Sequence, residues 1–186
     1  MQLIMPTIIT HSIFAALLGR FYRPDFISIP IWIVGALSAS LPDMDVLGFR
    51  FGIAYGSPYG HRGFTHSIFF ALLWAGLCTL FMNTWIAGKN KLISFVFLFL
   101  CTVSHGLLDS ITSGGKGVAF FFPFDNTRYF MPWRPVKVSG FGIDSLLSQR
   151  GVSVLLSEFK IILLPTIILL ICYVLAKKKI DTSKPY

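Results

Sequence analysis

Charged side chains are scarce in this sequence. They make up 13% of its 186 residues, whereas soluble globular domains contain about 25%. A domain of this length keeps much of its surface in water, so a water-soluble core cannot account for the deficit. Hydrophobic residues reach 54% and the mean hydropathy is +0.71. The composition excludes an ordinary soluble domain and indicates a protein embedded in lipid.

Cysteines are also few, and Cys78, Cys101 and Cys172 all lie inside apolar runs. Their spacing fits neither a disulfide framework nor a zinc knuckle, so we interpret them as small buried hydrophobic residues. No basic segment precedes the first apolar stretch, and we expect no cleavable signal peptide. The net charge of +8 comes from residues scattered between apolar blocks. This pattern indicates basic cytoplasmic loops and no nucleic-acid partner.

Five apolar blocks cover about residues 6–18, 26–41, 64–86, 92–108 and 159–176. A helix needs roughly 20 apolar residues to cross the bilayer, with about 17 as the lower limit. The last three blocks meet this limit, the second is marginal, and the first is short enough to lie at the interface. The sequence therefore predicts an all-α, multi-pass transmembrane bundle of about four or five helices, forming one domain over residues 1–186.

Residues 110–158 form a long connection rich in glycine, proline and aromatic side chains. A segment of this length between spans favours a folded cap on the membrane surface, and its aromatics suit the headgroup zone. We expect Arg128, Arg134 and Lys137 to contact lipid headgroups.

Ionisable residues gather at the ends of the apolar blocks, where such groups usually mark function. They are His11, Asp43, Asp45, His61, His66, His105 and Asp109. If the five blocks alternate in direction, all seven arrive at one side of the membrane. His105 and Asp109 are one turn apart on the same helix face. The sequence therefore predicts a shared site at one face of the bilayer.

Imidazole and carboxylate ligands suit Zn²⁺, Mn²⁺ or Fe²⁺, and the lack of thiolates argues against a structural zinc site. The predicted metal ligands are His11, Asp43, His61, His66, His105 and Asp109. We expect Asp43 or Asp45 to orient or deprotonate the attacking water, with the choice between them left open. Arg62 is expected to offset charge on phosphoryl oxygens.

Each element alone also has a simpler interpretation. A single histidine such as His11 is often an interhelical contact, and Asp43 with Asp45 could form a turn and a helix cap. Thr65 could be the N-cap of the third helix. Arg62 could anchor a helix at the headgroups.

Four motifs occur in order: His11-Ser12, Leu41-Pro42-Asp43-Met44-Asp45, His61-Arg62-Gly63-Phe64-Thr65-His66-Ser67 and Ser104-His105-Gly106-Leu107-Leu108-Asp109. The set resembles the YdjM-like family of bacterial membrane-bound, predicted metal-dependent hydrolases, over about the first 140 residues. The resemblance implies an inner-membrane location and hydrolase activity.

That family is distantly similar to the zinc-dependent phospholipase C and P1-type nuclease group. The similarity implies that the ligands are His11, Asp43 or Asp45, His66, His105 and Asp109. No histidine follows His105, so the resemblance implies one or two ions, most readily zinc, in place of three.

The predicted function is hydrolysis of a phosphoester in a membrane lipid or lipid-linked precursor. The alternative is a metal transporter or a metal-stabilised scaffold. A transporter would place its ligands near the bilayer midplane, whereas these lie at helix ends. An intramembrane metalloprotease would need a His-Glu-x-x-His helix, which this sequence lacks. The oligomeric state stays open.

Basic residues of the short connections indicate the orientation. Alternation places Arg20, Arg23, Lys89, Lys91, Lys177, Lys178, Lys179 and Lys184 on the side opposite the site. Basic residues in short loops stay cytoplasmic, so the site is predicted to face the extracytoplasmic side.

Overall fold

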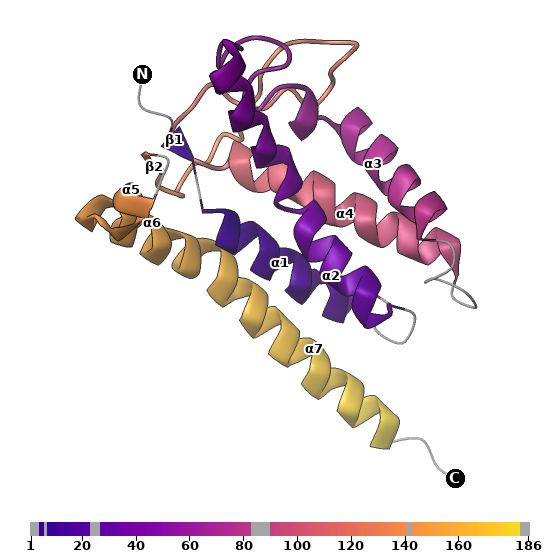
Figure 1. Cartoon of the computed structure of the whole chain (residues 1–186). Helices are drawn as coiled ribbons and strands as arrows, with labels where there is room; N and C mark the ends of the chain where they lie inside the picture. The colour runs from indigo at the N-terminus through magenta and orange to yellow at the C-terminus, as the bar shows by residue number, and fades with distance from the viewer. Residues whose placement is uncertain (1–3, 6, 23–26, 83–89, 141–142, 183–186) are drawn as a thin grey trace.

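The computed structural model describes residues 4–5, 7–22, 27–82, 90–140 and 143–182, which are mostly helical as predicted (Figure 1). The elements in chain order are β1 (Ile4–Met5), α1 (Ile8–Phe21), α2 (Ile29–Ser38), the 3₁₀ helices η1 (Leu41–Phe51) and η2 (Phe64–His66), α3 (Ile68–Phe81), α4 (Lys91–Ser110), β2 (Ser139–Gly140), α5 (Ile143–Leu147), α6 (Gln149–Glu158), the π-helix η3 (Phe159–Leu163) and α7 (Leu164–Thr182). β1 and β2 pair as a short antiparallel ribbon.

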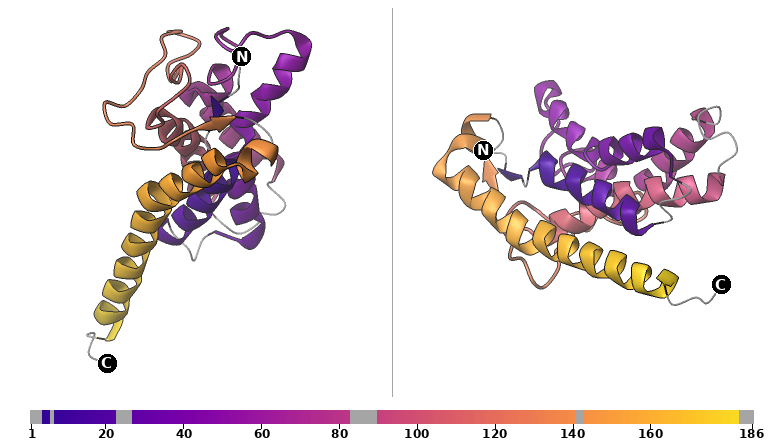
Figure 2. Two further views of the ribbon diagram at one scale, coloured as in Figure 1. Left: turned by 90° about the vertical axis from the view of Figure 1, so that its left-hand side faces the viewer. Right: turned by 90° about the horizontal axis from the view of Figure 1, so that it is seen from below.

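Helices α1 to α4 form a bundle with α4 at its centre (Figures 1 and 2). α4 packs against α1, α2 and α3. The buried core consists of Ala15, Ile31, Ala39, Ala75, Phe97, Leu98 and Cys101. α2 approaches α4 closely at Gly35, where a Cβ atom would lie 2.5 Å from the Phe97 ring. Small residues at helix contacts permit such close packing in lipid.

The last helix is the longest. α6, η3 and α7 follow one another as a single helix of 31 residues from Gln149 to Lys179. It runs along α1, with the rings of Phe21 and Tyr173 5.6 Å apart, and continues to the far end of the molecule (Figure 2). Little of its most apolar stretch is buried inside the protein. This surface suits contact with lipid tails.

Within the part of the chain that the structure describes, two helices are long and apolar enough to cross a membrane: α4 and the helix over 149–179. α2 and η1 would add a third span if this pair, bent by 42°, crosses as one unit. α1 and α3 are apolar but shorter among the described residues. Residues 6, 26 and 83–86 of the predicted blocks lie outside the part that the structure describes.

Two block boundaries were wrong. The second block does not continue as one straight helix to residue 41, because α2 ends at Ser38 and the chain bends into η1. Pro42 stands at the start of η1, and its missing N–H interrupts the α-helical bonding. The last helix begins at Gln149, ten residues before the predicted start, so residues 149–158 of the expected cap belong to it.

The segment over 111–138 covers the ends of the bundle helices (Figure 1). It is held by the bridges Thr112–Val136 and Val118–Tyr129. Val118 and Val136 are fully buried, and the Phe120 carbonyl accepts a hydrogen bond from the N–H of Ile68 at the start of α3. The segment is thus folded against the bundle.

Candidate metal centre

The predicted polar residues meet at one end of the bundle. They come from the first turns of α1, from η1, from the segment leading into α3 and from the end of α4 (Figure 1). Asp43 and Asp45 lie in η1, and His105 and Asp109 in α4. The convergence predicted from alternating helix directions is confirmed.

The centre of the cluster contains Asp43, His66, His105 and Asp109. Each offers one nitrogen or oxygen atom, and the four atoms lie within 4.8 Å of one another. His105 Nε2 is 3.3 Å from Asp43 Oδ1, and His66 Nε2 is 3.4 Å from Asp109 Oδ2. None of these side chains is more than 1% exposed. Such a buried group of imidazole and carboxylate ligands could hold a metal ion.

Hydrogen bonds outside the cluster orient both histidines. His105 Nδ1 lies 2.6 Å from the Ala39 carbonyl oxygen. Because a carbonyl can only accept, Nδ1 carries the hydrogen and the lone pair of Nε2 faces the cluster. His66 Nδ1 faces Asp45 Oδ2 at 3.2 Å, so its Nε2 also points inward. The two Nε2 atoms are 3.1 Å apart, an arrangement that requires a cation or a proton between them. Second contacts of this kind orient histidines in metal sites.

Asp45 supports the cluster from outside. Its carboxylate accepts hydrogen bonds from the Arg62 N–H (3.2 Å) and the Thr65 hydroxyl (2.7 Å), and lies 2.8 Å from His61 Nδ1. The Asp43 oxygens make no hydrogen bond. Asp43 is therefore the better candidate ligand, although Asp45, His61 and His66 form a second possible group.

His61 and His11 flank the central group. His61 Nδ1 is paired with Asp45, while its buried Nε2 has no hydrogen-bond partner. The His11 ring stacks on His105 with centroids 3.9 Å apart, and its Nε2 is 3.6 Å from Asp109 Oδ1. Both belong to the site, but neither lies among the four converging ligand atoms.

Arg62 makes a contact that the sequence interpretation missed. It is fully buried, and its Nε atom lies 2.8 Å from Asp109 Oδ2. Its Nη1 donates to the Gly114 carbonyl at 2.9 Å. In this structure the guanidinium therefore binds a predicted ligand and the cap, and is not open to a substrate phosphate.

Arg128 was predicted to contact headgroups, and this interpretation is wrong. Its guanidinium donates to the carbonyls of Tyr55, Ser57, His61 and Gly117. Burial lowers its pKa from the usual value. Arg128 holds the loop that carries His61.

One further prediction and one residue that the sequence interpretation missed concern the ends of helices. The N-cap of α3 is Ser67, whose side chain accepts from the Phe70 N–H, so the alternative with Thr65 as the cap is wrong. Glu158, which we did not single out, is buried and accepts from the Thr7 N–H and the Thr10 hydroxyl, both at 2.6 Å. An acidic residue at the edge of an apolar block was the signal that could have identified it.

Electrostatics favour positive charge in the cluster. Burial acts to lower the pKa of His66, but the surrounding carboxylates, led by Asp45, outweigh it. The pKa of His66 consequently lies well above the usual value of 6.5. The buried carboxylates thus attract either a proton or a metal ion.

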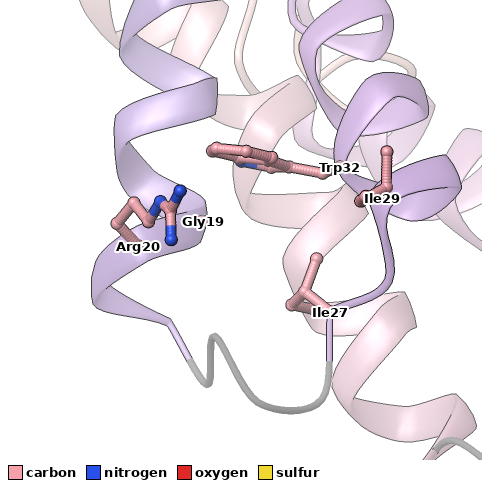
Figure 3. Close-up of a pocket in the computed structure, with 5 residues that line it drawn as sticks. All are labelled: Gly19, Arg20, Ile27, Ile29 and Trp32. Carbon is pink, nitrogen blue, oxygen red and sulfur yellow. The ribbon is translucent and has the colours of Figure 1, made fainter.

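A pocket of about 230 Å³ lies away from this centre, between the end of α1 and the start of α2 (Figure 3). Its lining residues are Gly19, Arg20, Ile27, Ile29 and Trp32. The Arg20 guanidinium is 4.8 Å from the centre of the Trp32 ring. His11 and Arg20 are nine residues apart in one helix, about 13 Å along its axis. This pocket is therefore not the opening of the polar cluster.

Comparison with known proteins supports the membrane assignment. The model of the YdjM inner membrane protein family matches residues 5–180. Inner membrane protein YbcI of Escherichia coli (strain K12) is 40% identical over 167 residues, which cover 89% of this chain and 95% of that protein. No solved structure matches the chain. The family match includes all the residues of the polar cluster.

Proposed function

The chain belongs to the YdjM inner membrane protein family, and from this premise we propose that it is a metal-dependent hydrolase. Its substrate would be a phosphoester in a membrane lipid or a lipid-linked precursor. The observation that carries the proposal is the buried group of Asp43, His66, His105 and Asp109, with both histidines turned inward.

The donor set fits a divalent transition metal. Two imidazole nitrogens and two carboxylates are typical zinc ligands, and Mn²⁺ or Fe²⁺ accept the same set. The oxygens of Asp43 are buried without hydrogen bonds, which is costly unless a cation satisfies them. A bound ion would act as a Lewis acid and would lower the pKa of a water molecule bound to it to about 7.

The remaining residues have distinct roles in this proposal. Asp45 holds His61 through Nδ1 and leaves Nε2 unpaired, as in carboxylate–histidine pairs that orient an imidazole for proton transfer. We therefore assign proton transfer to His61, supported by Asp45. Arg62 positions Asp109 and the cap.

The proposed position of the cluster suggests the substrate class. The cluster lies at one end of the helix bundle, which we place at the depth of the lipid phosphates. The exposed aromatics Phe121, Phe124 and Trp133 of the cap suit the same zone. A lipid or lipid-linked phosphoester is the substrate that such a location favours.

The proposed sidedness places the cluster on the extracytoplasmic side. Arg20, Lys91 and the lysines at 177–179 lie at the helix ends opposite the cluster; Arg23, Lys89 and Lys184 lie outside the described residues. Labelling with a membrane-impermeant thiol reagent tests this in a Cys172→Ser background, because Cys172 is exposed. Ala54→Cys in the exposed site loop should react in intact cells, and Ser183→Cys should not. The reverse result would place the site in the cytoplasm.

A metal-stabilised scaffold is the second candidate, and one observation favours it. The side chains of the cluster are almost completely buried, so a substrate reaches them only if the loop over 52–63 or the cap moves. A scaffold would need no such opening.

Turnover separates the two functions. Purified protein should hydrolyse lipid phosphomonoesters or phosphodiesters, lose this activity with a chelator and regain it with Zn²⁺ or Mn²⁺. His61→Gln should reduce turnover while leaving metal content unchanged, because His61 lies outside the four converging ligands. Metal binding without turnover on a broad lipid panel would leave the scaffold as the function.

A further inference from the structure

Arg62 is held in an unusual way. Among the residues that the structure describes, it is the one non-glycine residue with positive φ, at 62°. This left-handed conformation is sterically unfavourable for an L-residue with a side chain. The neighbouring Gly63 could adopt a positive φ without strain, but its φ is −91°. A strained residue beside an unstrained glycine indicates that the arginine side chain is required at this position.

The strained backbone gives Arg62 four simultaneous contacts. Its N–H donates to Asp45, its carbonyl accepts from the Ala119 N–H, and its Nη1 donates to Gly114. Its Nε faces Asp109 Oδ2 at 2.8 Å. The guanidinium is thereby fixed against a carboxylate of the central group.

Charge balance sets the number of ions. Three buried carboxylates, Asp43, Asp45 and Asp109, surround the histidines. Among the described residues, Arg62 is the only arginine or lysine with a fully buried side chain. One guanidinium leaves two negative charges, which one divalent ion neutralises. A second ion would leave excess positive charge in a buried site, which is costly.

We propose that Arg62 occupies the place of a second cation, so that the cluster binds one divalent ion per chain. This inference rests on the proposed metal site and specifies its composition. The ion is shared by Asp43, His66, His105 and Asp109, while Arg62 neutralises Asp109. Arg62 is therefore a positioning residue and does not contact substrate.

The test is metal stoichiometry in the full-length, detergent-purified protein. Titration with Mn²⁺ should saturate at one equivalent in the wild type and in Arg62→Lys, which keeps the charge. Arg62→Met removes the charge and opens space beside Asp109, so a second equivalent should bind. Arg134→Met is the matched control, because it removes an exposed guanidinium from the cap, and it should stay at one.

A measurement without substitutions covers the case in which Arg62→Met does not fold. The wild type loaded with Mn²⁺ should give the electron paramagnetic resonance spectrum of an isolated ion. A spin-coupled pair, or a folded Arg62→Met that stays at one equivalent, would overturn the inference while the metal site stands. No binding at all in the wild type would overturn the proposed function itself.

Discussion

The two ends of the helix bundle are built on different principles. At the site end, regular helix gives way to 3₁₀ turns, an arginine with positive φ and buried hydrogen bonds between distant residues. At the opposite end, α1, α2 and α4 pack through apolar and small side chains such as Gly19, Trp32 and Phe97. The apolar end depends on many similar contacts, whereas the site end depends on a few specific polar pairs, such as Arg62 with Asp109 and His105 with the Ala39 carbonyl. Substitutions at the two ends should therefore differ in kind.

The largest expected effect is loss of metal on substitution of a central ligand. His105→Ala should lower metal affinity about 100-fold or more, because even supporting residues of metal sites contribute about 10–100-fold. Elemental analysis of purified protein measures the occupancy. Gly19→Val at the apolar end is the contrasting variant, because its side chain would meet Trp32 and Phe97: it should lower stability by about 1–3 kcal/mol through overpacking and keep the metal. Equal metal content in the wild type and in His105→Ala would contradict the proposal that this cluster binds a metal ion.

Asp45→Asn should have the next largest effect. The amide keeps the size of Asp45 but weakens its contacts with His61 and His66. A loss of about 10–100-fold in metal affinity is expected for such a supporting carboxylate. Competition with a chelator measures it. If Asp45→Asn loses as much metal as Asp43→Asn, then Asp45 is itself a ligand.

Metal removal should reverse the pH dependence of stability. In the metal-free protein the pKa of His66 is raised above its unfolded value of 6.5, so its stabilisation is complete below pH 6.5 and is lost as the pH rises through the raised pKa. The metal-bound protein should instead weaken on acidification, because ligand histidines must be neutral. Thermal unfolding from pH 5.5 to 9, with and without chelator, should show opposite slopes. Parallel slopes would contradict the assignment of His66 as a metal ligand.

The smallest expected effects come from two helix caps at opposite ends of the bundle. Ser67 caps α3 at the site end, and Asn90 caps α4 at the other end. Loss of a cap costs about 1 kcal/mol, so Ser67→Ala and Asn90→Ala should destabilise the protein similarly. Only Ser67→Ala should also lower metal affinity, because Ser67 follows His66 directly. Equal metal binding in both variants would show that the site tolerates movement of this turn.

The sequence predicted the parts of the molecule that depend on polarity and helix direction. The helical class followed from the apolar blocks, and the meeting of His11, Asp43 and Asp109 followed from alternation. The spacing of His105 and Asp109 correctly placed them on one face of α4, where His105 Nε2 lies 3.9 Å from Asp109 Oδ2.

The missed features depend on backbone groups and on long-range pairing. The carbonyl partners of Arg128 and His105 have no side-chain signal in the sequence. The pairing of Arg62 with Asp109 required the path of the loop after η1, which no periodicity reveals. Glu158 is 148 residues from its partner Thr10, and only the fold brings them together.

The bend between α2 and η1 has a consequence for how the site could evolve. The Ala39 carbonyl at this bend accepts from His105, and Pro42, three residues later, has no N–H that could compete for it. The histidine and the interrupted helix satisfy each other, since an unsatisfied buried carbonyl is costly. Neither His105 nor the interrupted helix can be replaced alone without leaving a buried polar group unpaired, which costs about 1–3 kcal/mol of stability. Lineages that lose the metal should therefore retain His105 longer than Asp43, whose oxygens have no other hydrogen-bond partner.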